Sequence, residues 1–183
     1  VGGNEAVWTR AAGELGGEAR LLGMDLLRLA LERGATAAGA ARACTDLLEA
    51  HGQGGGCAED DDGWTYENGF IFADASEAFV VETAGVSWWA VERVPLGSFR
   101  NISNGISIRS EHHALHPGLK QHCRERGWWD GTEPFDFKAV LTGTSSTAQL
   151  APAGRERCGR ELLGDLARDA AAGRVASPVA LAR

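Results

Sequence analysis

One short stretch of the chain concentrates the side chains that bind metals. Its histidines and the neighbouring cysteine are His112, His113, His116, His122 and Cys123. Two histidines four residues apart on one helix face can hold a zinc ion, and His112 and His116 have this spacing. Pro117, however, disfavours helical backbone at His116, and no Glu occupies the general-base position of an HExxH motif. We interpret these residues as surface histidines and expect no metal.

Two asparagines have side chains suited to amide hydrolysis. Asn4 lies in GNEAV and Asn104 in SNGISI. An Asn amide donates hydrogen bonds without changing charge, so it can stabilise the oxyanion of a tetrahedral intermediate. The pair Asn104-Gly105 is also typical of a hairpin turn. The residues alone leave both interpretations of Asn104 open.

A glycine-rich segment and an acidic run lie between the first helices and the first long strand. The segment GQGGGC at 52–57 lacks the GK[ST] of a phosphate-binding loop. In the run 59–62 the acidic residues are consecutive, whereas calcium loops space their ligands at alternate positions. The glycine-rich segment is interpreted as a flexible helix-to-strand loop and the acidic run as a solvated charge run, and no cofactor is expected.

The four cysteines are Cys44, Cys57, Cys123 and Cys158. No secretory signal precedes them, so they are expected to be free thiols in a reducing compartment, which predicts a cytoplasmic location. Cys44 and Cys158 fall on the apolar faces of helical patterns and are expected in the core. None lies in a context that would lower its pKa.

The composition is that of a globular protein and gives no sign of a nucleic-acid-binding or membrane-spanning one. The 183 residues are 44% hydrophobic and 23% charged, with a formal net charge of -7, which is typical of a globular protein. No basic stripe offsets the acidic charge, so nucleic acid is not an expected partner. No apolar run reaches the length of a transmembrane helix, so no membrane span is expected.

Hydrophobic periodicity predicts an α+β fold. Helices are predicted at 20–33, 37–50, 117–126 and 152–172, with one or two helical turns at 135–142 and a polar linker at 142–149. Between them, an antiparallel strand meander is predicted over about 69–109, with strands at 69–74, 78–83 and 87–94 and a possible extension at 106–109. On a strand, Trp88 and Trp89 must face opposite sides of the sheet.

Several long phrases resemble the secernin family, relatives of N-terminal-nucleophile cysteine dipeptidases, and they occur in the same order. They are NEAVW at 4–8, LLGMDLLRLALERG at 21–34, HGQGGGC at 51–57, FADASEAFVVETAG at 72–85, RNISNGISI at 100–108 and GWWDG at 127–131. The resemblance implies part of a four-layer αββα sandwich. A second sheet would cover the face of the meander that its helices leave bare.

The resemblance also implies an activity. In this family an N-terminal Cys supplies both the attacking thiolate and, through its α-amino group, the base. The expected substrate is a dipeptide or small amide. Asn104 is the implied pocket residue and Asn4 the implied oxyanion donor. The family name implies a secretory-machinery partner, and a non-catalytic regulator of exocytosis that retains the hydrolase fold is the alternative.

The chain departs from the family pattern in two ways. It begins at Val1 rather than at the catalytic Cys, so we expect residues 1–183 to form a single incomplete domain, truncated at both ends and inactive without the missing segment. Gly105 stands where related sequences tend to have a polar residue such as Gln, which weakens the assignment of Asn104.

Overall fold

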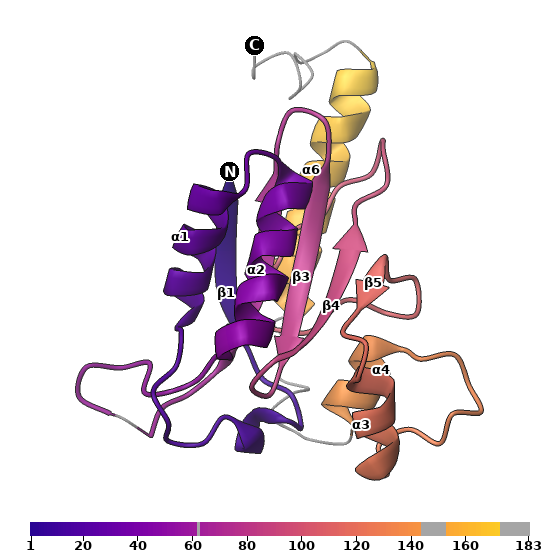
Figure 1. The fold of residues 1–183 in the computed structure, drawn as a ribbon. Coiled ribbons are helices and arrows are strands. Elements are labelled where there is room, and N and C mark those ends of the chain that lie inside the picture. Colours follow the sequence, from indigo (N-terminus) through magenta and orange to yellow (C-terminus); the bar gives the residue numbers. More distant parts are fainter. Residues whose placement is uncertain (62, 144–152, 173–183) are drawn as a thin grey trace.

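The computed structural model describes residues 1–61, 63–143 and 153–172, and in this part the fold is α+β, as predicted. A five-stranded antiparallel sheet has the order β1-β2-β3-β4-β5 (Figure 1). Its strands are β1 (Gly2–Val7), β2 (Glu67–Ala73), β3 (Ala78–Ala84), β4 (Trp88–Arg93) and β5 (Ala114–Leu115). The helices are η1 (Ala12–Glu14, a 3₁₀ turn), α1 (Gly23–Arg33), α2 (Ala37–His51), α3 (Leu119–Glu125), α4 (Phe137–Thr142) and α6 (Ala153–Ala171).

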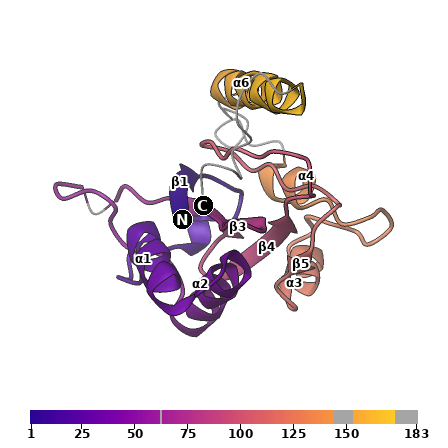
Figure 2. The same cartoon turned by 90° about the horizontal axis from the view of Figure 1, so that it is seen from above.

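The helices α1 and α2 form a hairpin that covers one face of the sheet (Figures 1 and 2). Thr36 caps α2, as its side chain accepts a hydrogen bond from Gly39 N at 3.0 Å. Apolar residues of the hairpin pack on the side chains that β2, β3 and β4 present to this face. The buried core on this side contains Leu26, Ala30, Leu48, Phe70, Phe72, Phe79, Val81 and Trp89.

The opposite face of the sheet is not bare in the described part. The segment 102–108 and the helices α3 and α4 pack on it, and their buried side chains include Ile106, Ile108, Leu119, Phe137 and Leu141. The expectation that the helices would leave this face bare is therefore not met in the described part. Figure 2 places α6 on the far side of the sheet from α1 and α2.

The alternation of side chains along each strand divides them between the two cores. Phe79 and Val81 of β3 face the helix hairpin, whereas Val80 faces the other core. The prediction that the two tryptophans face opposite sides is confirmed, since Trp89 belongs to the hairpin side and Trp88 packs against the other core. The three predicted strands of the meander are confirmed as β2, β3 and β4, and β1 pairs with β2 along the outer edge.

Near the end of the meander, the structure lacks the strand extension considered at 106–109 and the hairpin turn that was one of the two open interpretations of Asn104. Residues 106–109 do not form a strand, and the backbone N–H groups of Ser107 and Ile108 bind a buried carboxylate, Glu82, instead of a neighbouring strand. Nor is Asn104-Gly105 a type I′ hairpin turn. That turn requires positive φ at both central residues, and neither has it.

The predicted helices are confirmed, with small shifts of their ends. One prediction about α6 is wrong, since Cys158 is exposed rather than part of the core. On the same helix Leu162 and Leu166 are 60% and 49% exposed, so this apolar stripe does not face the sheet. The predicted linker at 142–149 falls mostly on residues 144–152, outside the described part.

Candidate functional site

The two asparagines singled out from the sequence lie on opposite faces of the sheet. Successive residues of a strand point to opposite sides. Asn4 of β1 faces the helix hairpin, where its side chain contacts Asn68. Asn104 contacts Glu5, the next residue of β1, on the other face. The sheet therefore separates the two amides, and they do not converge on a single oxyanion.

Asn4 lies at one end of a chain of side-chain amides whose other members, Asn68 and Gln53, are buried. Its Nδ2 donates to Asn68 Oδ1 at 3.2 Å, and Asn68 Nδ2 donates to Gln53 Oε1 at 2.9 Å. Gln53 Nε2 then donates to Thr83 Oγ1 at 2.8 Å and to Gly85 O at 2.9 Å. A satisfied buried network of this kind specifies how elements pack. It joins β1, β2 and β3 to the segment that follows α2.

The first residue of α1 rests directly on this network. A Cβ atom at Gly23 would lie 1.8 Å from Asn68 Oδ1 and 2.7 Å from Asn4 Nδ2. Only glycine leaves room for these amides beneath the start of the helix. The position of Asn4 is thus explained by packing between α1 and the sheet.

Asn104 anchors the segment 101–108 to the edge strand β1. Its Nδ2 donates to Ala6 O at 2.9 Å and to Glu5 Oε2 at 3.2 Å. An amide nitrogen has two protons, so these two bonds account for both. In this structure Asn104 therefore holds its segment against β1. To bind an oxyanion, its amide would have to give up one of these two hydrogen bonds and donate that proton to the substrate oxygen instead.

The same face of the sheet carries a second carboxylate, Glu82, in register with Glu5. In the sheet, Glu5 pairs with Gly69 and Gly69 pairs with Glu82. Glu5, Gly69 and Glu82 thus form one row across three strands. Because Gly69 has no side chain, no side chain of this row lies between the two carboxylates. Asn104 lies over one end of the row, at Glu5, and the segment that follows it reaches the other end.

Glu82 is 2% exposed and is surrounded by donors from one segment. It accepts hydrogen bonds from Ser107 N at 2.8 and 2.9 Å and from Ile108 N at 2.9 Å, and the Ser107 hydroxyl donates to it as well. Burial raises the pKa of Glu82, while these hydrogen bonds and the charge of Arg100 oppose the rise.

Arg100 completes this cluster. Its guanidinium donates to both oxygens of Glu92, at 2.8 and 2.7 Å, and to Ser107 Oγ at 3.0 Å. Bidentate pairs of this kind hold a fixed geometry. We name Glu82, Glu92, Arg100 and Ser107 the Glu82 cluster, and it fixes the segment that carries Asn104. The sequence signal for this cluster is the lone Glu in the apolar run AFVVETA, for which no role was predicted.

Two of the four cysteines, Cys44 and Cys123, are poorly suited to act as nucleophiles. Burial raises the pKa of Cys44 and of Cys123 to about 12, so both thiols stay protonated at neutral pH. Cys44 lies in the core, as predicted. Cys57 is half-buried and donates to Gly55 O at 3.6 Å.

His116 and His122 contact aromatic rings, and His122 also contacts a carboxylate. The His122 ring stacks on Trp88 with centroids 4.6 Å apart, and its Nε2 lies 3.1 Å from Glu14 Oε1. His116 meets the edge of Trp88 at 4.7 Å, and burial lowers its pKa. Within residues 1–61, 63–143 and 153–172, no three His, Cys, Asp or Glu side chains gather as a metal site.

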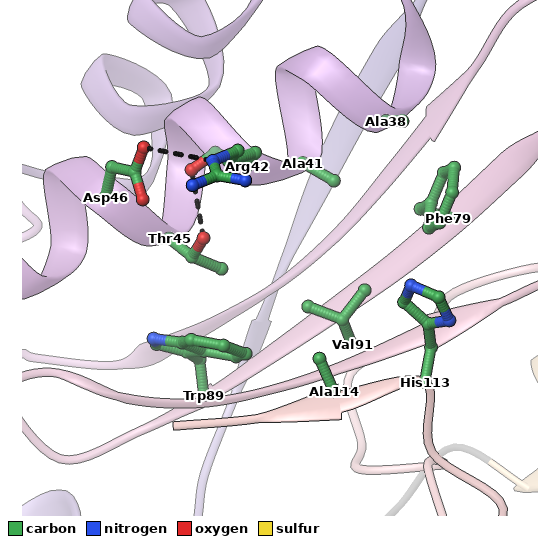
Figure 3. Close-up of a pocket in the computed structure, with 10 residues that line it drawn as sticks. All are labelled: Ala38, Ala41, Arg42, Thr45, Asp46, Phe79, Trp89, Val91, His113 and Ala114. Carbon is green, nitrogen blue, oxygen red and sulfur yellow. Dashed lines mark hydrogen bonds and ion pairs between the residues drawn. The ribbon is translucent and has the colours of Figure 1, made fainter. Parts of the chain in front are cut away.

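A groove runs between α2 and the β4–β5 end of the sheet, with a volume of about 420 Å³. Figure 3 shows Arg42, Thr45 and Asp46 of α2 along one wall and the sheet residues along the other. The lining residues are Ala38, Ala41, Arg42, Thr45, Asp46, Phe79, Trp89, Val91, His113 and Ala114. The groove lies on the hairpin side, away from Asn104.

The described part thus has a polar row on one face of the sheet and a groove on the other. No protein-family model matches the sequence. None of the described helices combines the length and apolar composition that a membrane crossing needs.

Proposed function

We propose that this chain is part of a secernin-like N-terminal-nucleophile hydrolase that cleaves dipeptides or related small amides in the cytoplasm. The nucleophile is a cysteine at the mature N-terminus of the parent protein. Its thiolate attacks the substrate carbonyl and its α-amino group, which titrates near neutrality, accepts the proton. An acyl-enzyme thioester follows, and water hydrolyses it.

The position of Asn104 carries this proposal. Asn104 lies on the face of the sheet opposite α1 and α2, which is where an αββα sandwich has its second sheet. The Glu82 cluster holds the neighbouring backbone rigidly, as a preorganised oxyanion donor requires. In the described part, the segment 102–108 and the helices α3 and α4 already cover this face, so the row of polar groups is enclosed between them and the sheet.

The proposal gives the two asparagines different roles. A substrate carbonyl would take over the amide proton that Asn104 now donates to Glu5, since that bond, at 3.2 Å, is the longer of its two. Asn4 stays in its network on the hairpin side and has a structural role. Cys44 and Cys123 do not replace the N-terminal cysteine, because their raised pKa keeps them protonated.

The decisive experiment uses the full-length parent. Its mature N-terminal residue is determined by mass spectrometry, and a panel of dipeptides is assayed before and after alkylation with iodoacetamide. We expect a free N-terminal Cys and hydrolysis that alkylation abolishes. A Cys-initiated chain that hydrolyses no dipeptide would overturn the proposal. A blocked or absent N-terminal Cys would favour the non-catalytic regulator of exocytosis.

Substituting the two asparagines in the parent separates their roles. Asn104→Ala is expected to lower kcat by about 10²-fold, the effect of losing one oxyanion donor. Asn4→Ala is expected to lower the midpoint of urea unfolding while kcat stays within about twofold, because its lost hydrogen bond costs only about 1 kcal/mol of stability. Equal kcat values for the two folded variants would remove Asn104 from the reaction.

A further inference from the structure

The groove between α2 and the sheet exists because two small residues face two large ones. Ala38 and Ala41 of α2 lie opposite Phe79 and Val91 (Figure 3). Their short side chains leave space that leucines at the same positions would fill. With a volume of about 420 Å³, the groove falls at the small end of the range for ligand sites.

The apolar floor of the groove is held in place. Trp89 Nε1 donates to Glu49 Oε1 at 2.9 Å, which fixes the indole ring across the floor. The ring of Phe79 meets the edge of the His113 ring with centroids 5.9 Å apart. A floor that does not have to reorganise binds an apolar group without an added ordering cost.

The mouth of the groove carries one charge of each sign. Arg42 and Asp46 are one helical turn apart on α2, with Nε and Oδ2 separated by 3.8 Å. This distance is too long for a good hydrogen bond, and the side chains are 83% and 67% exposed. An exposed pair of this kind contributes little to stability, so exchanging it for charges on a ligand costs little.

We infer that this groove binds a small zwitterion with an apolar body, namely an apolar α-amino acid. The guanidinium of Arg42 takes the carboxylate in the planar geometry that suits it, and Asp46 takes the ammonium. The apolar side chain lies on Trp89, between Ala41 and Val91. This site goes beyond the proposed hydrolase function and shares no residue with the row around Asn104.

The test is direct binding of free amino acids, measured by isothermal titration calorimetry on the purified protein. L-Leucine and L-phenylalanine are expected to bind saturably. Glycine, N-acetyl-L-phenylalanine and L-phenylalaninamide, which lack the apolar body, the ammonium and the carboxylate respectively, are expected to bind at least about tenfold more weakly. No turnover is involved, so the result is independent of any peptidase activity.

Variants separate the groove from the rest of the surface. Arg42→Gln and Asp46→Asn are each expected to raise the Kd for L-phenylalanine at least about fivefold, since each removes one charge-assisted hydrogen bond. Arg28→Gln is the matched control, because Arg28 forms a similarly spaced exposed pair with Glu32 on α1, and it should leave the Kd unchanged. Ala38→Leu, checked for folding by circular dichroism, should abolish binding by filling the groove.

Three results would overturn the inference. The first is the absence of saturable binding of either amino acid. The second is equally tight binding of N-acetyl-L-phenylalanine or L-phenylalaninamide, which would mean that the groove does not recognise both the ammonium and the carboxylate of the ligand. The third is an equal rise in the Kd for L-phenylalanine in Arg28→Gln and Arg42→Gln. That result would mean that the ligand binds elsewhere or responds only to the overall surface charge.

Discussion

Raising the pH from about 5 to about 8 is expected to lower the free energy of unfolding by about 3 kcal/mol through one residue, Glu67. Burial raises the pKa of Glu67 from 4.5 to about 7, against the opposing effect of hydrogen bonds from Thr9 and Gly85. The folded state therefore holds the proton more tightly than the unfolded state. The stabilisation is complete below pH 4.5 and is lost as the pH rises through about 7.

Urea unfolding at several pH values measures this effect. Glu67→Gln removes the titrating group, so the difference in stability between wild type and variant should change with pH in this window. Other groups titrate too: the raised pKa of Glu82 acts in the same direction and the lowered pKa of His116 in the opposite one. Comparison with the variant isolates Glu67, and the exposed Glu32→Gln serves as the control. Parallel pH profiles for wild type and Glu67→Gln would contradict the prediction.

Replacing Gly34 by alanine is expected to destabilise the protein by about 3 kcal/mol or more, at the upper end for an overpacked site. Gly34 ends α1 just before the N-cap of α2. A Cβ there would lie 2.2 Å from Ala40 N and 2.4 Å from Ala40 Cα. These are backbone atoms, so no side-chain rotation relieves the contact. The two helices would have to separate, which would open the core that they form with the sheet.

The effect of Gly34→Ala is measured as a shift of thermal unfolding, expected to be a decrease in Tm of about 10 °C for a chain of this size. Gly3→Ala is the matched control, because a Cβ at Gly3 meets nothing within 4 Å. The control should leave Tm within about 2 °C, in line with other surface substitutions. A Gly34→Ala protein as stable as the control would show that the α1–α2 link tolerates a wider approach.

Local pattern predicted the secondary structure well for clear physical reasons. The helix hairpin follows from leucines at helical spacing in 20–33 and from the Thr36 cap, and both signals depend only on nearby residues. The meander follows from alternation, which also placed Trp88 and Trp89 on opposite faces. The exposure of Leu162 and Leu166 on α6 was not predictable in this way. An apolar stripe predicts a helix, but it does not show whether another element packs on that stripe.

The segment 101–108 shows where local pattern stops being informative. Its apolar residues at 106 and 108 alternate as in a strand, but the N–H groups of Ser107 and Ile108 bind Glu82, which is distant in the sequence. A buried carboxylate competes with a neighbouring strand for the same donors, and only the fold brings it there. Asn104 likewise bonds to a group that only the fold brings near it, since its side chain donates to Ala6 O of β1 instead of forming a hairpin turn.

The residues alone predicted the α+β class, the hairpin of helices and the strands of the meander, and they singled out Asn4 and Asn104. They did not show that Asn4 and Asn104 are on opposite sides of the sheet. That separation arises because neighbouring residues of β1 point in opposite directions while distant segments pack on each face. The charged groove has the same origin, since α2 and β4 meet only when the chain folds.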